Sequence, residues 1–216
     1  MKISFLLPSL FFLMQALLPA QNCSNICIDF DPAANPVSDY VESTAAPVAS
    51  NANFTIEARF LLPTTNTGTG QRFLIGLGGT TNRLELLEMG GLLRIVRQST
   101  TVGSSLSSLS TLNFRDGAWH HLAATRNGSV LNVYLDGSLI WTNSAFTGNM
   151  AITTFRVGAP AMAGALANNT WDGLIDEVRV WNTVRTSAQI AANARCGLQG
   201  NEAGLALYYR FQQGVA

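Results

Sequence analysis

The sequence predicts an all-β fold, a two-sheet antiparallel β-sandwich of the jelly-roll type. Apolar and polar residues alternate with a period of two in many short segments, which is the pattern of half-buried strands. Glycine, Asn-Gly and Asp-Gly positions separate these segments, as tight hairpins require. Only one segment, near 186–196, has the pattern of a helix. Many short strands with one late helix favour a sandwich over a mixed α/β fold.

The composition excludes several other classes of protein. Of the 216 residues, 47% are hydrophobic and 12% are charged, with 13 Lys+Arg against 13 Asp+Glu. Charged residues make up about a quarter of an average soluble domain, so this chain is too apolar to be disordered. It has no excess of basic residues to neutralise phosphates, which argues against a nucleic-acid partner.

The first twenty residues have the pattern of a secretory signal peptide. Lys2 precedes an almost wholly apolar run at residues 3–18, and the small residue Ala20 precedes a polar segment. The run is shorter than the roughly 20 residues that a membrane span needs. We therefore expect cleavage after Ala20, one secreted domain over residues 21–216 at the cell surface or outside the cell, and no membrane span in the mature chain.

Secretion affects the interpretation of the three cysteines, Cys23, Cys27 and Cys196. In an oxidising compartment two of them are expected to pair. A bridge from Cys196 to either N-terminal cysteine would close a loop of about 170 residues and stabilise the domain by several kcal/mol. We expect Cys27–Cys196, with Cys23 as the alternative partner.

The first strong strand covers residues 53–62. Apolar side chains alternate on one face from Phe54 to Phe60, and the other face, with Glu57 and Arg59, is expected to be solvated. Further strands are expected at residues 72–77, 84–89, 92–96, 119–125, 130–135, 139–141, 155–158, 174–181 and 205–211.

Two turns organise the middle of the chain. Asn127-Gly128 and Asp136-Gly137 each predict a tight hairpin, so residues 119–142 are expected to form a three-stranded meander. Segments 63–70 and 159–169 have the composition of loops, and the serine-rich segment 106–112 is ambiguous.

The predicted helix begins with a capping box, because Thr186 and Gln189 have the required spacing. Gly197 provides a stop signal, so we expect a helix of about ten residues.

No catalytic residues are predicted. Glycoside hydrolysis needs two carboxylates that face one another, whereas Glu85 and Glu88 are three apart and point to opposite faces of a strand. His120 and His121 are adjacent and point in opposite directions, so they cannot bind one metal ion together. We expect one of them to be packed or hydrogen-bonded inside and the other to lie outside. The sequence therefore favours a protein that is not an enzyme.

Asp176 is the carboxylate with the clearest need for a partner. In a regular strand over residues 174–181 it shares a face with the core residues Val178 and Val180. A buried carboxylate is paired, hydrogen-bonded or bound to a metal, and calcium prefers such oxygen ligands. A backbone amide or an arginine is the alternative partner to calcium.

Aromatic side chains at the surface are the usual sugar platforms of lectins. Trp141, Trp171 and Tyr209 are the candidates for such ligand contacts, whereas Trp119 and Trp181 are expected in the core.

Five segments, in order along the chain, resemble LamG-like (laminin G-like, pentraxin-like) jelly-roll domains of the concanavalin A-like lectin/glucanase superfamily, particularly in secreted proteins of the Bacteroidetes type. They are residues 27–31 (CIDFD), 54–60 (FTIEARF), 119–123 (WHHLA), 133–137 (VYLDG) and 173–182 (GLIDEVRVWN). The resemblance covers nearly all of the mature chain and implies the sandwich fold. Residues 32–38 replace a shorter link of the family.

The resemblance also implies a function and a structural ion. Calcium at one edge of the sandwich in many relatives implicates Asp31, Asp39 and Asp176 as ligands. The expected function is a secreted, non-catalytic binding or adhesion module for a glycan or another extracellular or cell-surface protein. A glycoside hydrolase-related domain of the same superfamily and a structural spacer in a longer adhesin are the alternatives.

Overall fold

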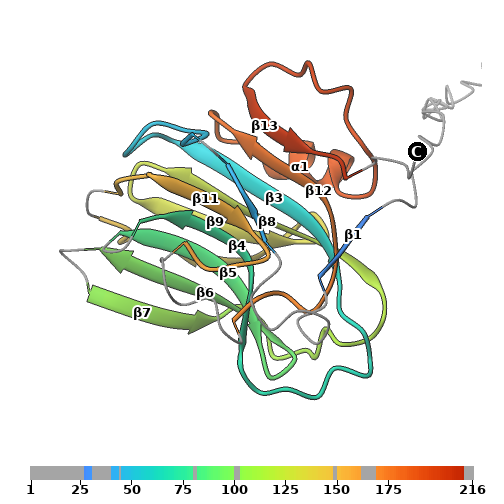
Figure 1. Cartoon of the computed structure of the whole chain (residues 1–216). Coiled ribbons are helices and arrows are strands. Elements are labelled where there is room, and N and C mark those ends of the chain that lie inside the picture. Colours follow the sequence, from blue (N-terminus) through green and yellow to red (C-terminus); the bar gives the residue numbers. More distant parts are fainter. Residues whose placement is uncertain are drawn as a thin grey trace, which may run out of the picture.

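The computed structural model is an antiparallel β-sandwich with one short helix, as the sequence predicts (Figure 1). It describes residues 27–30, 40–43, 45–79, 82–99, 103–147, 150–161 and 169–211. The predicted signal peptide, Cys23, Asp31 and Asp39 lie outside these residues. Within the described part of the chain, no helix is long and apolar enough to cross a membrane.

Two sheets form the layers of the sandwich. The first sheet contains, in spatial order, β1 (Ile28–Phe30), β12 (Gly173–Trp181), β3 (Phe54–Leu61), β8 (Trp119–Asn127), β9 (Val130–Leu135) and β10 (Ser138–Asn143), and β13 (Leu205–Tyr209) also pairs with β12. The second sheet contains β2 (Val41–Glu42), β11 (Thr154–Val157), β4 (Gln71–Gly78), β5 (Arg83–Met89), β6 (Leu92–Ser99) and β7 (Gly103–Ser108).

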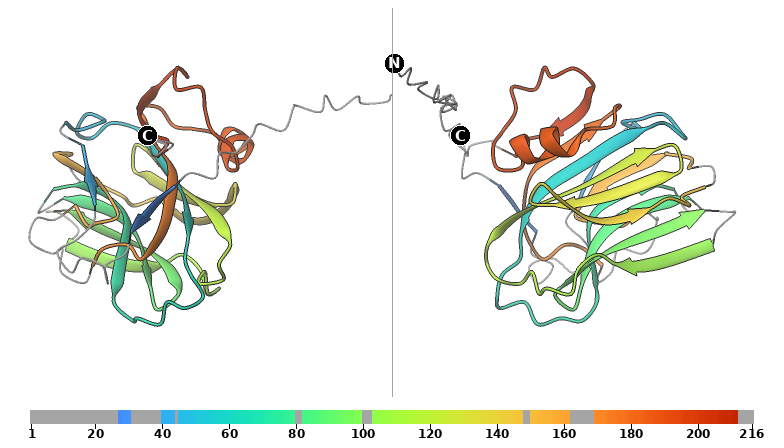
Figure 2. Two further views of the ribbon diagram at one scale, coloured as in Figure 1. Left: turned by 45° about the vertical axis from the view of Figure 1, so that its right-hand side comes forward. Right: turned by 180° about the vertical axis from the view of Figure 1, so that it is seen from behind.

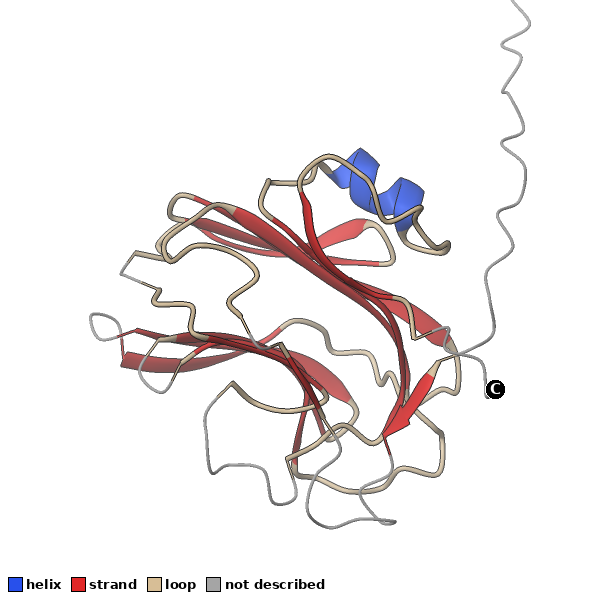
Figure 3. Ribbon diagram, turned by 45° about the horizontal axis from the view of Figure 1, so that its top comes forward, coloured by secondary structure: helices blue, strands red, loops and turns tan. Residues whose placement is uncertain are grey.

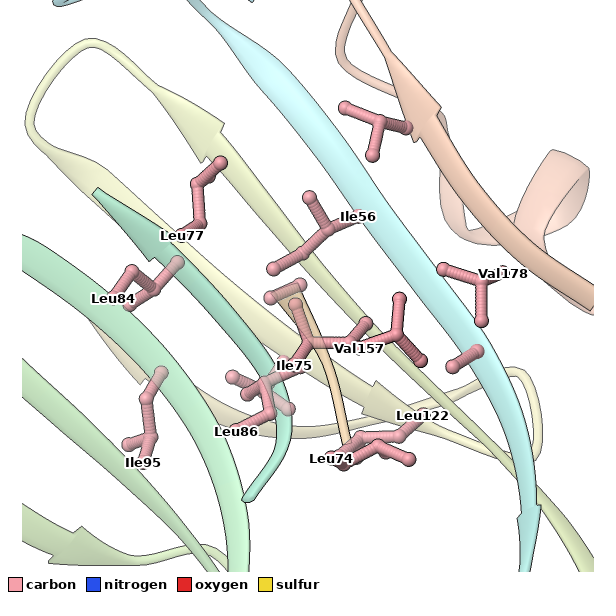
Figure 4. Close-up of a cluster of buried hydrophobic side chains, with 14 of the residues drawn as sticks. Ile56, Leu74, Ile75, Leu77, Leu84, Leu86, Ile95, Leu122, Val157 and Val178 are labelled. Atoms are coloured by element: carbon pink, nitrogen blue, oxygen red, sulfur yellow. The ribbon is translucent and has the colours of Figure 1, made fainter. Parts of the chain in front are cut away.

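The core lies between the two sheets. Figure 4 shows Ile56 and Val178 of the first sheet on the side of the strands that faces Leu84, Leu86 and Ile95 of the second sheet. All five side chains are fully buried within one apolar cluster. Burying one such side chain contributes about 1.5–3 kcal/mol, so this interior is the main source of stability.

The predicted meander is confirmed as β8, β9 and β10. Gly128 has a φ of 58°, and Asp136 and Gly137 have φ values of 49° and 84°. Asp136 and Gly137 are two consecutive residues with positive φ, the turn type whose twist matches a two-residue hairpin. At the first hairpin only Gly128 has a positive φ, and Asn127 is the last residue of β8 and pairs with Val130. The turn chemistry and the alternation therefore specify this part of the first sheet locally.

The helix α1 (Ser187–Asn193) lies against the outer face of the first sheet, the face directed away from the core (Figure 3). Ile190 of α1 packs on Ala123 and Tyr134. A Cβ atom added at Gly137 would lie 2.7 Å from that of Ala191, so this glycine admits the helix as well as forming the turn.

The covering helix explains one wrong expectation. Glu57 was expected on a solvated face, but it is fully buried, as is Thr55 on the same side of β3. In Figure 2, α1 lies over this side of the sheet, whereas β13 extends the sheet beside β12. Period-two alternation identifies the two faces of a strand, but it does not show whether a later segment covers the polar face.

The capping box of α1 is confirmed, but the predicted length of the helix is wrong. The Gln189 amide N–H donates to Thr186 Oγ1 at 3.2 Å, and the Thr186 N–H donates to Gln189 Oε1 at 2.9 Å. The helix ends at Asn193, before the predicted glycine stop. Arg179 donates to the carbonyl oxygens of Asn193 at 2.9 Å and Cys196 at 2.6 Å. This side chain of β12 therefore satisfies backbone acceptors at and beyond the end of the helix.

A β-bulge in β12 corrects the predicted face of Asp176. The ladder to β3 shifts register between Asp176 and Arg179, and Glu177 has a φ of 51°. The extra residue reverses the alternation. Asp176 therefore lies opposite Arg59 and does not share the core face with Val178.

Cys27 and Cys196 are both half-buried and are not joined to each other by a disulfide. The predicted Cys27–Cys196 bridge is thus not formed in this structure. The alternative with Cys23 involves a residue outside the described part of the chain and stays a prediction.

Candidate ligand-binding site

The candidate site lies where an edge strand of one sheet approaches an edge strand of the other. β10 is the last strand of the first sheet and β7 is the last strand of the second sheet (Figure 2, yellow and light green). We call this part of the molecule the open edge and define it by Trp141 and Asn143 of β10, Arg97 of β6, and Ser105 and Ser107 of β7. All five residues are partly exposed.

Trp141 forms the apolar part of the open edge. It pairs with the core residue Val133 across the β9–β10 ladder, so its ring faces inward and packs against the core cluster. The Arg97 guanidinium lies over the ring, with 5.6 Å between Cζ and the ring centroid. A cation over an indole face is attracted to it, so Arg97 holds the ring in place from the opposite sheet.

The polar residues of the open edge come from the same sides of the strands. Ser105 pairs with Arg97, Ser107 pairs with the core residue Ile95, and Asn143 pairs with the core residue Leu131. Residues directly opposite in a ladder share a face, so these groups are all directed to the side between the sheets. A tryptophan ring beside hydroxyl, amide and guanidinium groups combines the apolar and polar contacts that ligand sites use.

Arg97 differs in its partners from the arginines that pair with carboxylates elsewhere in the protein. Its guanidinium donates to the Ser105 hydroxyl at 3.0 Å, and no carboxylate of the described residues lies within the 4.0 Å of an ion pair. Its Nε atom is buried without an acceptor. Burial lowers the pKa of Arg97 below its usual range, which reflects the cost of partial desolvation. The open edge therefore holds an uncompensated positive charge.

Elsewhere the buried carboxylates have cationic partners. Arg83 pairs with Glu85 at 3.0 Å, and Glu88 lies between Arg72 and Arg115. Burial raises the pKa of Glu85. The charges of Glu85 and Glu88 are thus paired with arginines.

The outer face of the first sheet contains a second buried network, under α1. Arg179 lies 2.7 Å from Glu177 and 3.7 Å from Glu57, and His121 Nε2 lies 3.0 Å from Glu57. The Tyr208 hydroxyl donates to Glu177 at 2.5 Å. All of these side chains except that of Tyr208 are at most 2% exposed, so the network is not accessible to a substrate.

Burial and charge act in opposite directions in this network. Burial disfavours the charged form of Glu57, but the hydrogen bond from His121 and the nearby arginines hold its pKa below the usual range. Burial and the Glu177 carboxylate raise the pKa of Tyr208 to about 12. The network therefore joins the C-terminal segment to the sheet.

The two adjacent histidines have different environments, as predicted. His121 is buried in this network, whereas His120 is partly exposed between two carboxylates. His120 Nδ1 lies 2.9 Å from Asp136 Oδ2, and Nε2 lies 3.2 Å from Asp116 Oδ2. Hydrogen bonding to Asp136 is the largest of the contributions that raise the pKa of His120.

The three aromatic residues predicted to contact sugar lie in three different environments. Trp141 lies at the open edge, whereas Tyr209 is partly buried and stacks on Phe211 with 5.8 Å between the ring centroids. The expectation that Trp171 is exposed is wrong, because its ring is fully buried with an edge contact to Phe60 at 5.6 Å. The backbone hydrogen bond from Trp171 N–H to Gly158 O fixes it at the core.

The two tryptophans expected in the core also differ. Trp181 is fully buried, as predicted. Trp119 is partly exposed, with the Arg59 guanidinium 4.9 Å from its ring centroid. Trp119 thus forms an arginine-covered tryptophan on the outer face of the first sheet, comparable to Trp141 at the open edge.

Asp176 is the one predicted calcium ligand that the structure describes. It is 2% exposed; Oδ1 accepts from the Glu177 N–H at 2.8 Å, and Oδ2 lies 3.9 Å from Arg59. Burial raises its pKa to about 6. The described residues contain no group of three His, Cys, Asp or Glu side chains that could hold a metal ion. Asp176 is thus a sparsely partnered carboxylate that fits one ligand position and does not form a site alone.

A family model for the concanavalin A-like lectin/glucanase superfamily matches residues 35–191. The chain belongs to this superfamily. Its sandwich is similar to that of a heptameric SAP-like pentraxin from Limulus polyphemus, with a TM-score of 0.63, 15% identity, and 86% of this chain and 91% of that chain covered. It is also similar to a putative carbohydrate-binding protein from Bacteroides ovatus, with a TM-score of 0.56, 19% identity, and 88% and 50% covered.

One curated relative is similar in sequence over part of the chain. Pappalysin-1 from Mus musculus is 26% identical over 98 residues, which is 45% of this superfamily member and 6% of the relative. The match therefore covers a small part of a much longer protein. These comparisons confirm the LamG-like sandwich that the motifs imply.

The sequence proposed Trp141 as a ligand contact but did not single out Arg97, Ser105 or Ser107 of the open edge. A signal was present, because no Asp or Glu occurs between Glu88 and Asp116. Neither β6 nor β7 therefore contains an acidic residue. The sequence does not predict that β7 and β10 are the last strands of their sheets at the same edge of the sandwich.

Proposed function

We propose that this protein is a secreted, non-catalytic glycan-binding module that recognises its ligand at the open edge. The observation that carries the proposal is the partly exposed Trp141 ring, held by Arg97, which also donates to the Ser105 hydroxyl. The superfamily and the carbohydrate-binding name of the Bacteroides ovatus neighbour support this class of ligand. The signal-peptide pattern of residues 1–20 supports secretion.

The geometry supports binding because the open edge requires little rearrangement. Trp141 is fixed by its packing on the core and by Arg97, so a sugar ring can contact it at low entropic cost. A glycan attached to a surface protein has the same chemistry as a free one, which makes extracellular glycoproteins further partners.

Calcium belongs to the proposal as a structural ion. Asp176 would hold it together with Asp31 and Asp39, and the ion would supply positive charge to a buried carboxylate. The open edge is formed by other residues, so glycan contact at Trp141 does not require calcium as a ligand bridge.

The test is a glycan-array and calorimetric screen of the purified protein, in calcium and again in EDTA. We expect Trp141→Ala to weaken glycan binding at least about tenfold, since truncating a central aromatic anchor commonly costs more than about 1.4 kcal/mol. Trp119→Ala is the matched control, because it also removes a partly exposed, arginine-covered ring and should leave binding unchanged.

Three outcomes contradict the proposal. Equal binding by the Trp141→Ala variant would move the site elsewhere. No binding to any glycan would favour a protein partner or a structural spacer. Release of reducing sugar from a polysaccharide by the wild-type protein would indicate a hydrolase.

A further inference from the structure

We infer that the ligand of the open edge is an anionic glycan, one that carries carboxylate or sulfate groups. This inference rests on the proposed function and specifies its class of ligand. It follows from the charges of the strands that form the site, and not from the aromatic ring.

Among the residues that the structure describes, no carboxylate compensates the charge of Arg97. Its partners are the Ser105 hydroxyl at 3.0 Å and the Trp141 ring at 5.6 Å, both uncharged. A partly desolvated guanidinium forms its strongest contacts with carboxylate, phosphate or sulfate oxygens, in a bidentate geometry. An incoming anion would supply the missing partner.

The strands that form the open edge, β6, β7 and β10, contain no acidic residue. Between Glu88 and Asp116 the chain contains Arg94, Arg97 and Arg115 and no Asp or Glu, so β6 and β7 have only positive side-chain charge. Within β10 there is no charged residue. The nearest acid of its hairpin, Asp136, is bonded to His120 at the turn. An anion approaching the open edge therefore meets no fixed negative charge on these strands.

Arg97 also differs from Arg126, another arginine that has no carboxylate partner among the described residues. Arg126 also lies over an aromatic ring, that of Phe146, but it is only 6% exposed and donates to the Ala52 carbonyl at 3.2 Å. It closes the core at one end of β8. Arg97 is partly exposed and its hydroxyl partner, Ser105, can rotate to donate to a ligand as well.

The experiment compares matched pairs of glycans that differ only in charge. The pairs are polygalacturonate and its methyl ester, sialylated and desialylated oligosaccharide, and dextran sulfate and dextran. We expect the wild-type protein to bind the acidic member of at least one pair about tenfold more tightly than the neutral member. The pair that shows the preference identifies carboxylate or sulfate as its source.

Two variants locate the preference at Arg97. Arg97→Gln should reduce the preference to less than about twofold, whereas Arg97→Lys should retain part of it. Arg94→Gln is the matched control, since Arg94 lies on the same strand, donates to the Ser108 hydroxyl at 2.9 Å and faces away from the core. It removes the same charge and should retain the preference.

A measurement on the unaltered protein covers the case in which Arg97→Gln does not fold. Raising the salt concentration from about 0.05 to about 0.5 M should weaken binding of the acidic glycan and leave any neutral binding unchanged. Equal affinity for both members of every pair, or a preference that survives in Arg97→Gln, would overturn the inference. Failure to bind any glycan would overturn the proposed function itself, so the two failures are distinguishable.

Discussion

At the residue scale, the protein is defined by which charges are paired. Glu57, Glu88 and Glu177 are almost fully buried, and each has an arginine or histidine partner. A buried charge without such a partner would cost several kcal/mol. Arg97, on which the proposed ligand class depends, instead has a hydroxyl and an aromatic ring as its partners.

His120 predicts a pH dependence of stability. Its pKa is raised in the folded state, so its stabilisation is complete below the ordinary value of about 6.5 and is lost as the pH rises through the raised pKa. Asp116 and Asp136 have lowered pKa values and stay charged over this range. In the wild-type protein we expect the free energy of unfolding to fall by about 1 kcal/mol as the pH rises through the raised pKa of His120. The effect is small because solvent screens the partly exposed imidazole.

Urea unfolding between pH 6 and 9 and an NMR titration of the imidazole check this prediction. In the His120→Gln variant the step should be absent. An imidazole that titrates at or below its ordinary pKa would contradict the assignment of the two carboxylates as its partners.

At the scale of elements, the C-terminal segment is held by a side chain of β12. Arg179 lies between the buried carboxylates of Glu57 and Glu177 and donates to carbonyl oxygens at and beyond the end of α1. A helix of seven residues is too short to be stable alone, so its position depends on these contacts and on the packing of Ile190.

Arg179→Met should therefore destabilise the protein strongly. It leaves two buried carboxylates without their shared cation, for which we expect a loss of about 3–5 kcal/mol in the free energy of unfolding, measured by urea denaturation. Arg210→Met is the control, because Arg210 is exposed and contacts the same Tyr208 ring at 5.7 Å. A small effect of Arg179→Met, comparable to that of the control, would show that the network does not hold the segment.

At the scale of the whole molecule, one core joins the two sheets, and the two proposed sites lie apart from each other outside this core. The open edge uses β7 and β10, which are the last strands of their sheets. Asp176 lies on β12, which is separated from β10 by β3, β8 and β9. A structural ion near Asp176 and a ligand at Trp141 would therefore affect stability and binding separately.

Calcium should raise the midpoint of thermal unfolding by about 5–10 °C relative to EDTA when it is present at about 100 times its dissociation constant. Asp176→Asn should abolish this difference and leave glycan binding at the open edge unchanged. An unchanged midpoint in calcium would remove the ion from the proposal.

The sequence alone determined the elements whose signals are local. The hairpins at Gly128 and at Asp136-Gly137 depend on backbone conformations that these residues favour, and the Thr186 capping box depends on a spacing of three. Alternation identified the long strands, and ordered motifs identified the superfamily. β1 and β2, with three and two residues, are too short for a periodic signal.

Only the tertiary structure decided which faces are covered and which charges meet. The bulge at Glu177 reversed the face of Asp176, α1 buried Glu57, and Trp171 entered the core. The helix ends at Asn193, whose carbonyl oxygen accepts a hydrogen bond from Arg179 of β12. The open edge brings together Arg97 and Trp141 from different sheets. No periodicity or spacing in the sequence predicts a long-range contact of this kind.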